Sequence, residues 1–166
     1  MPVKITYKEL PSLIPQKIET KSKGLIGGII LWVLTTRKWK LAEDWKFSLQ
    51  MDGQKTSTQF MIPKGFETDG ASIPKFLRSW VSVTGVLLAG GLIHDYGYKM
   101  ATLRLATKKP KAITTKDQKW MDQLFRDINI DVNGFFLLNW AAYIALRLGG
   151  WLAWNGHRKR NVQWDD

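Results

Sequence analysis

The chain has 166 residues, and 25 Lys and Arg against 14 Asp and Glu give it a formal net charge of +11. It contains no cysteine, which excludes disulfides, zinc–thiolate sites and thiol nucleophiles, and its two histidines exclude a multi-histidine metal centre. Nine tryptophans accompany the positive charge, a combination typical of a surface that meets nucleic acid or anionic lipid headgroups. No nucleic-acid-binding motif is recognised, so nucleic acid is the less expected partner.

Residues 1–36 are predicted to form a basic N-terminal arm. Prolines interrupt its polar first part, so we expect an extended segment with little core of its own. Residues 24–34 are apolar but shorter than the roughly 20 residues that span a bilayer. They are interpreted first as a buried strand or packing segment and second as an interfacial anchor. No cleavable signal peptide is expected, because no small-residue cleavage site is present.

One globular domain is expected over residues 37–156, followed by a basic and acidic tail at 157–166. It begins with alternating apolar and polar residues from 37 to 62, which predict an antiparallel hairpin with one half-buried face. The hairpin turn is expected at residues 51–54, whose sequence is Met-Asp-Gly-Gln.

Helical patterns dominate the second half of the chain. A helix is predicted from about 115 to 128, with Thr115 as its N-cap. Another is predicted from about 135 to 154; it is apolar nearly all round, with Asn139 and Arg147 as the exceptions. A buried central helix is the first interpretation of this segment, and a helix in or across a membrane is the second. The expected fold class is α+β, with a small antiparallel hairpin or sheet packed on a core of about three helices.

The chain's one interior histidine, His94, follows a pair of glycines in an otherwise apolar stretch. On a helix, His94 and Tyr98 share a face, whereas Asp95 points about 100° away and cannot orient its neighbour. A second acid must hold the imidazole if His94 acts as a base, and Asp122 on the following helix is the candidate. A carboxylate that accepts one ring N–H leaves the other ring nitrogen able to take a proton.

The loop after the hairpin offers hard oxygen ligands. Asp69 supplies a carboxylate, and Gly70 permits a turn that aims backbone carbonyls inward. Together with Asp95 they form an oxygen-rich set suited to Ca²⁺, which takes six to eight oxygen ligands. The sequence has no EF-hand loop, so this calcium site would be assembled from separate segments.

Three blocks of sequence carry a resemblance to a known family. They are Ile-Pro-Lys-Gly-Phe-Glu-Thr-Asp-Gly-Ala-Ser-Ile-Pro at 62–74, His-Asp-Tyr-Gly-Tyr at 94–98 and Asp-Gln-Leu-Phe at 122–125. By their order and content, residues of roughly 38–150 resemble the phage and prophage domain of unknown function numbered 1353.

The same blocks also resemble secreted phospholipase A2, especially its prokaryotic and fungal branch. The Asp-Gly-x-Ser-x-x-Pro loop, the His-Asp-x-Gly-Tyr helix and the Asp-x-x-Phe helix have counterparts here, with Ala71 and Met121 where that pattern has cysteines. The resemblance implies a phospholipase A2-like antiparallel helix pair. It further implies that His94 activates a water against the sn-2 ester, that Asp122 orients His94, and that Tyr98 hydrogen-bonds Asp122. Asp69, the Gly70 carbonyl and Asp95 would hold Ca²⁺.

Two functions are therefore expected. The first is a phage-encoded, calcium-dependent, phospholipase A2-like ester hydrolase that acts on anionic phospholipid membranes. The alternative is a non-catalytic virion or host-interaction protein that keeps the same residues for structure and binds other phage structural proteins. The expected location is the virion, or the envelope or cytoplasm of the host cell.

Overall fold

The computed structural model describes residues 3–17, 38–68, 87–107, 112–114 and 117–160. The apolar stretch at 24–34 and the expected calcium ligands Asp69 and Gly70 lie outside these residues.

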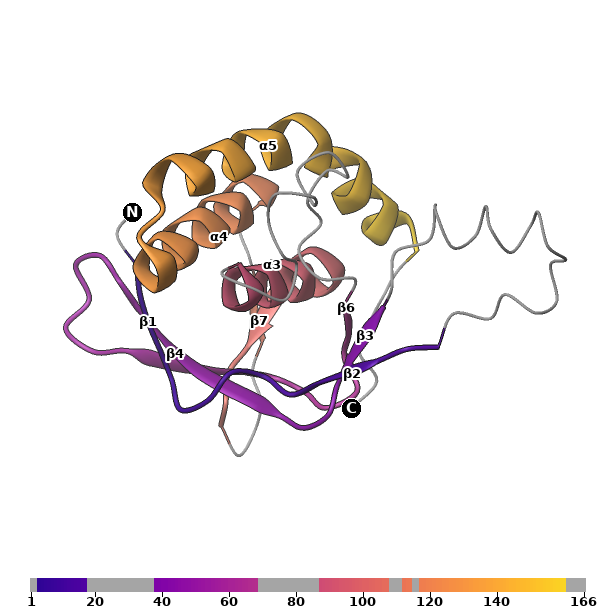
Figure 1. The fold of residues 1–166 in the computed structure, drawn as a ribbon, viewed down its shortest axis with the longest axis horizontal. Coiled ribbons are helices and arrows are strands. Elements are labelled where there is room, and N and C mark those ends of the chain that lie inside the picture. The colour runs from indigo at the N-terminus through magenta and orange to yellow at the C-terminus, as the bar shows by residue number, and fades with distance from the viewer. Residues whose placement is uncertain (1–2, 18–37, 69–86, 108–111, 115–116, 161–166) are drawn as a thin grey trace, which may run out of the picture.

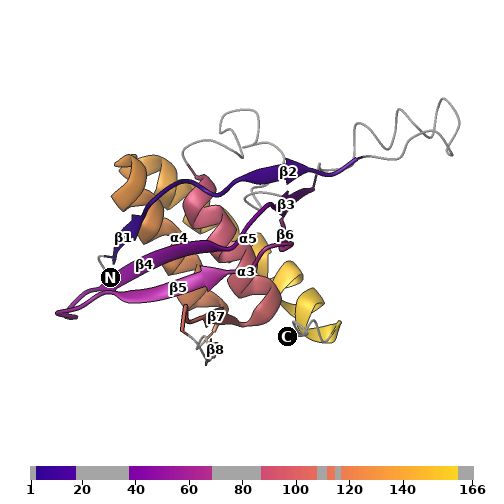
Figure 2. The same cartoon turned by 90° about the horizontal axis from the view of Figure 1, so that it is seen from below.

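The described residues form an α+β fold, as the sequence predicts (Figures 1 and 2). All of its paired strands are antiparallel. One sheet has the order β1 (Val3–Tyr7), β4 (Trp45–Met51) and β5 (Thr58–Ile62), and a second has the order β2 (Leu13–Pro15), β3 (Trp39–Leu41) and β6 (Glu67–Thr68). A third sheet pairs β7 (Thr102–Arg104) with β8 (Ala112–Thr114), and the helices are α3 (Leu88–Met100), α4 (Gln118–Asn133) and α5 (Phe136–Lys159).

The predicted hairpin is the β4–β5 pair, but its expected beginning at residues 39–41 is wrong, because this segment forms β3 and pairs with β2 and β6 in the second sheet. Trp45, Phe47 and Leu49 alternate with polar residues along β4 and are buried in the core, as period-two patterning requires. The chain reverses at the expected turn, where the Gln54 amide donates to the Met51 carbonyl and Gly53 adopts a positive φ of 79°.

The beginning of the expected N-terminal arm is part of this sheet. Residues 3–7 form β1, which pairs with β4 along its whole length, and the side chains of Val3 and Ile5 are buried. The expectation of little core in this segment is wrong here, because its short alternation of apolar and polar residues suits a strand with one buried face. The backbone amide of Ile5 also donates to the Asp131 carboxylate at 2.8 Å, which ties β1 to α4.

The helices lie in layers against the β1–β4–β5 sheet (Figure 1). Helix α3 is central, and every residue from Leu88 to Tyr98 is buried. Helix α4 begins at Gln118 after its N-cap Asp117, which lies two residues later than the expected cap at position 115 and whose carboxylate accepts the Trp120 amide. It ends at Gly134, which adopts the left-handed conformation.

Helix α5 is not the buried central helix of the first interpretation. It lies on the side of α3 and α4 that faces away from the sheet (Figure 1), and only Asn139, Ala142, Leu146 and Gly150 are buried along its length. It continues to Lys159, so residues 157–159, expected in the tail, are helical. By length and composition α5 is the one helix in the described part of the chain that could cross a membrane.

Candidate functional site

Helices α3 and α4 approach each other closely and run antiparallel. Contacts on α3 progress from Gly90 to Gly97, while their partners on α4 run backwards from Asn129 to Met121. A Cβ built on Gly97 would lie 1.9 Å from the methyl carbon of Met121, so any larger residue at this position would require the Met121 side chain to move. The side chains of the expected His94–Asp122 pair project into this interface.

Asp122 is the centre of a buried hydrogen-bond cluster. Its Oδ1 lies 2.9 Å from His94 Nε2 and accepts the Tyr98 hydroxyl at 2.5 Å. Its Oδ2 accepts Arg147 Nη1 at 2.8 Å and Gln118 Nε2 at 3.4 Å. The structure therefore brings together His94, Tyr98 and Asp122, which the sequence singled out, and adds two more donors.

The charge state of Asp122 follows from these donors. Burial by itself raises the pKa of a carboxyl, but hydrogen bonds from His94, Tyr98 and Arg147 outweigh it, and the pKa of Asp122 is lowered. The pKa of Tyr98 is raised, first by burial and then by its hydrogen bond to Asp122, so its hydroxyl remains a donor. The bond to Asp122 likewise raises the pKa of Arg147.

These charge states determine the tautomer of His94. An ionised carboxylate only accepts hydrogen bonds, so the proton between Asp122 and His94 belongs to Nε2. A neutral imidazole protonated at Nε2 carries its lone pair on Nδ1, and no hydrogen bond to Nδ1 is present among the described residues. The ring itself is held between Tyr98 and Phe125, with centroid distances of 4.0 and 5.4 Å. The arrangement can accept a proton at Nδ1 and stabilise the resulting imidazolium through Asp122.

Arg147 and Gln118 were not among the residues predicted for the site. Arg147 gave a signal, since it is the one charged residue in an otherwise apolar stretch of helix, and such a charge needs a partner. Gln118 precedes Asp122 by one helical turn, a spacing at which side chains meet.

The C-terminal half of α5 also secures the end of α3. Gly150 lies against the Tyr98 hydroxyl, where a Cβ would be 2.5 Å away, and the Trp154 ring meets the Tyr98 ring edge to face. The Arg158 guanidinium donates to the carbonyls of Tyr98 and Lys99 in the last turn of α3. A cation at this end satisfies carbonyls that have no partner within the helix.

Asp95, the expected calcium ligand on α3, is buried on a different side of the helix from His94. Its carboxylate accepts the hydroxyl of Thr68, the last residue of β6 and the one before Asp69. Within the described residues, no three His, Asp or Glu side chains cluster as metal ligands. The rest of the expected calcium set, Asp69 and Gly70, falls outside the described residues.

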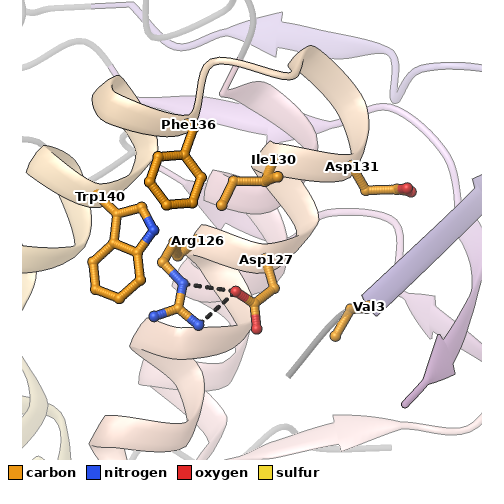
Figure 3. A pocket seen from close by; sticks show the side chains of 7 residues that line it. All are labelled: Val3, Arg126, Asp127, Ile130, Asp131, Phe136 and Trp140. Atoms are coloured by element: carbon orange, nitrogen blue, oxygen red, sulfur yellow. Dashed lines mark hydrogen bonds and ion pairs between the residues drawn. The ribbon is translucent and has the colours of Figure 1, made fainter. Parts of the chain in front are cut away.

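A separate cavity of about 320 Å³ lies between α4, β1 and the start of α5 (Figure 3). Arg126 in its wall is paired with Asp127 at 2.6 Å and stacks on the Trp140 ring at 4.3 Å. The Trp140 indole N–H is buried and has no hydrogen-bond partner among the residues that the structure describes. Neither His94 nor Asp122 lines this cavity, so it is distinct from the cluster around Asp122.

Comparison with known proteins places this geometry within a family. No curated protein and no solved structure matches the chain significantly. Residues 39–146, well over half of the chain, match a family described as Protein of unknown function (DUF1353). That range contains β3 to β8, α3, α4 and α5 as far as Leu146, and it ends one residue before Arg147, the α5 donor to Asp122. The chain therefore belongs to the DUF1353 family.

Proposed function

We propose that this chain is a phage-encoded, calcium-dependent ester hydrolase of the phospholipase A2 type, acting on anionic phospholipid membranes. The observation that carries the proposal is the hydrogen bond of 2.9 Å between His94 Nε2 and the ionised Asp122, which directs the basic lone pair of the imidazole to Nδ1. A general base needs that protonation state and a partner that stabilises its conjugate acid.

In the proposed reaction, His94 Nδ1 takes a proton from the water that attacks the ester carbonyl. Asp122 then stabilises the imidazolium through Nε2, as a buried carboxylate does beside a catalytic histidine. Tyr98 and Arg147 hold the two oxygens of Asp122, so that its orientation is determined by three helices. His94 subsequently returns the proton to the leaving alcohol.

The oxygen atoms near Asp95 are of the kind that bind calcium. Asp95 offers a buried carboxylate, which accepts a hydrogen bond from the Thr68 hydroxyl. Because Thr68 directly precedes Asp69, this bond holds the start of the loop next to Asp95. Asp95 with Asp69 and the Gly70 carbonyl would form the oxygen ligands that calcium prefers. A calcium ion bound there supplies positive charge for the oxyanion of the ester carbonyl.

A second candidate function is a non-catalytic virion or host-interaction protein, in which the same cluster serves stability. The burial of the pair favours it, since the exposed fraction is 1% for His94 and 0% for Asp122. A fully hydrogen-bonded buried cluster also rigidifies a core without any chemistry. In this role the partners would be other phage structural proteins.

The two functions are separated by assaying fatty-acid release from phosphatidylglycerol vesicles, with calcium or with a chelator. The hydrolase predicts calcium-dependent release that falls by about 10²–10⁴-fold in His94→Gln. His157→Gln is the matched control, because it replaces the chain's other histidine, which lies away from Asp122 on α5.

Urea unfolding of each variant accompanies the assay. Release that persists in His94→Gln, or no release by the wild type with calcium, contradicts the hydrolase. The non-catalytic role predicts that His94→Gln changes only the free energy of unfolding.

A further inference from the structure

The outward face of α5 is a continuous apolar strip. Its most exposed members are Leu137, Leu148 and Leu152, whose exposed fractions are 83%, 76% and 63%. Ile144 and Trp151 are also exposed. We call these five residues the α5 outer strip. Contiguous exposed apolar surface of this kind marks an interaction site.

The strip follows from the helical period. Leu137, Ile144 and Leu148 are seven and four residues apart, and Trp151 and Leu152 follow Leu148 by three and four, which places the five residues along one side of the helix. From Leu137 to Leu152 it extends about 22 Å, at about 1.5 Å per residue. The opposite side of α5 carries the buried Asn139, Ala142 and Leu146, so it is committed to the protein core. Arg147 lies at the edge between the two sides, half-buried, and reaches Asp122 from there. The outer strip is the side of α5 that the rest of the described protein leaves exposed.

Charge distinguishes the partners that could cover this strip. Helix α5 contains no Asp or Glu, and its last turn and C-cap carry Arg158, Lys159 and Arg160. Because the whole chain has a net charge of +11, two copies repel each other, whereas an anionic surface attracts the chain. A tryptophan on an apolar helix face next to basic residues suits the headgroup boundary of a bilayer.

We propose that α5 lies in the plane of an anionic phospholipid membrane, with the outer strip inserted at the headgroup boundary and Lys159 and Arg160 against the lipid phosphates. The helix lies on the membrane and does not cross it, because crossing would separate Arg147 from Asp122 and expose Asn139 to hydrocarbon. The proposal names the surface that would bring the protein to the membrane, and in that respect it rests on the proposed function.

The test is cosedimentation with vesicles of phosphatidylglycerol or phosphatidylcholine, in the presence of a chelator so that neither calcium nor hydrolysis contributes. The wild type is expected to bind phosphatidylglycerol vesicles at least about tenfold more tightly than phosphatidylcholine vesicles. The double variant Leu148→Asn/Leu152→Asn should weaken binding about tenfold or more, because each leucine loses apolar burial. The matched control is Leu10→Asn, which replaces another exposed leucine, 57% exposed, outside α5.

A second variant tests the charge. Lys159→Gln/Arg160→Gln should weaken binding by about fivefold for each charge removed, and it leaves the strip intact. His94→Gln should bind vesicles as the wild type does, so loss of hydrolysis and loss of membrane binding are read separately.

Three results would overturn the proposal. The first is that the wild type does not bind phosphatidylglycerol vesicles, and the second is that the Leu148→Asn/Leu152→Asn variant binds them as tightly as the wild type. The third is that the wild type is a dimer and does not bind vesicles, whereas the variant is a monomer. The last result assigns the strip to a second copy of the chain. A wild type that binds vesicles but releases no fatty acid leaves this proposal in place and removes the hydrolase.

Discussion

Asp122 accepts hydrogen bonds from side chains on α3, α4 and α5, and its own side chain has no contact with solvent. Burying an ion costs several kcal/mol unless the surrounding donors compensate. Here the compensation comes from the hydrogen bonds that His94, Tyr98 and the Arg147 guanidinium donate to the carboxylate. Removing the carboxylate charge therefore leaves several donors with a weaker acceptor, at a point where water cannot replace it.

We predict that Asp122→Asn lowers the free energy of unfolding by about 3–5 kcal/mol near neutral pH, as expected when one partner of a buried ion pair is lost. The loss should depend on pH. Because the pKa of Asp122 is lowered from 3.8 in the folded protein, its contribution is complete above that value and disappears as the pH falls through the folded pKa. Urea unfolding of both proteins across the acid range measures the difference.

The control for this series is Asp52→Asn, in the exposed hairpin turn, which should change stability by less than about 0.5 kcal/mol. A difference between wild type and Asp122→Asn that stays constant into the acid range would show that the carboxylate charge is not what stabilises the cluster.

Among the elements, α3 and α4 set the distance between His94 and Asp122. Gly90 and Gly97 permit the close approach, because a Cβ on either would overlap Asn129 or Met121. The sequence pointed to the glycine pair before His94 as unusual. It could not show that Gly97 permits a helix contact, because that role depends on Met121, the residue that faces it on α4.

We predict that Gly97→Ala destabilises the protein, although alanine favours a helix by about 1 kcal/mol over glycine. The added methyl overlaps Met121, and overpacking of a buried site costs about 1–3 kcal/mol. Combining it with Met121→Ala should give less than the sum of the two single losses in a double-mutant cycle, because the methyl then fills vacated space. Gly149→Ala is the matched control: a Cβ there meets nothing within 4 Å, so it should be neutral or stabilising. Additive losses at 97 and 121 would contradict a direct contact.

The elements also show where sequence patterns suffice. Period-two alternation located β4, β5 and their turn correctly, because a half-buried strand imposes that period. The prediction that α5 is a buried central helix was wrong. A helix that is apolar all round has the same sequence pattern whether its outer face is covered by protein or left exposed. The alternation in residues 3–7 was too short to stand out beside the prolines that follow it, although it makes β1.

For the molecule as a whole, the pairing of His94 with Asp122 was predictable, and the closure of the cluster by Arg147 was not. The pairing could be predicted from two helices whose buried faces are evident in the sequence, and from the need of a basic histidine for a carboxylate partner. The closure depends on the register of α5 along α4, which a helix without a distinct polar face does not reveal. Tertiary packing, not local pattern, decides which side of α5 supplies the arginine.

The calcium site can be tested through the stability of the whole molecule, independently of hydrolysis. A ligand that binds only the folded state stabilises it by about 2.7 kcal/mol at 100 times its dissociation constant. We predict that calcium raises the urea midpoint of the wild type and leaves that of Asp95→Asn unchanged. The variant keeps a side-chain oxygen that can accept the Thr68 hydroxyl, so its fold should persist.

Magnesium is the control for charge screening, because it demands a smaller, octahedral set of ligands and sheds its water reluctantly. A chain with a net charge of +11 has no general attraction for divalent cations, so a calcium-specific shift requires a local cluster of oxygen ligands. Equal shifts in the wild type and Asp95→Asn would remove Asp95 from the ligands. A calcium-induced shift that occurs in the wild type and in His94→Gln, but not in Asp95→Asn, would assign the metal to Asp95 and its loop even if no ester is cleaved.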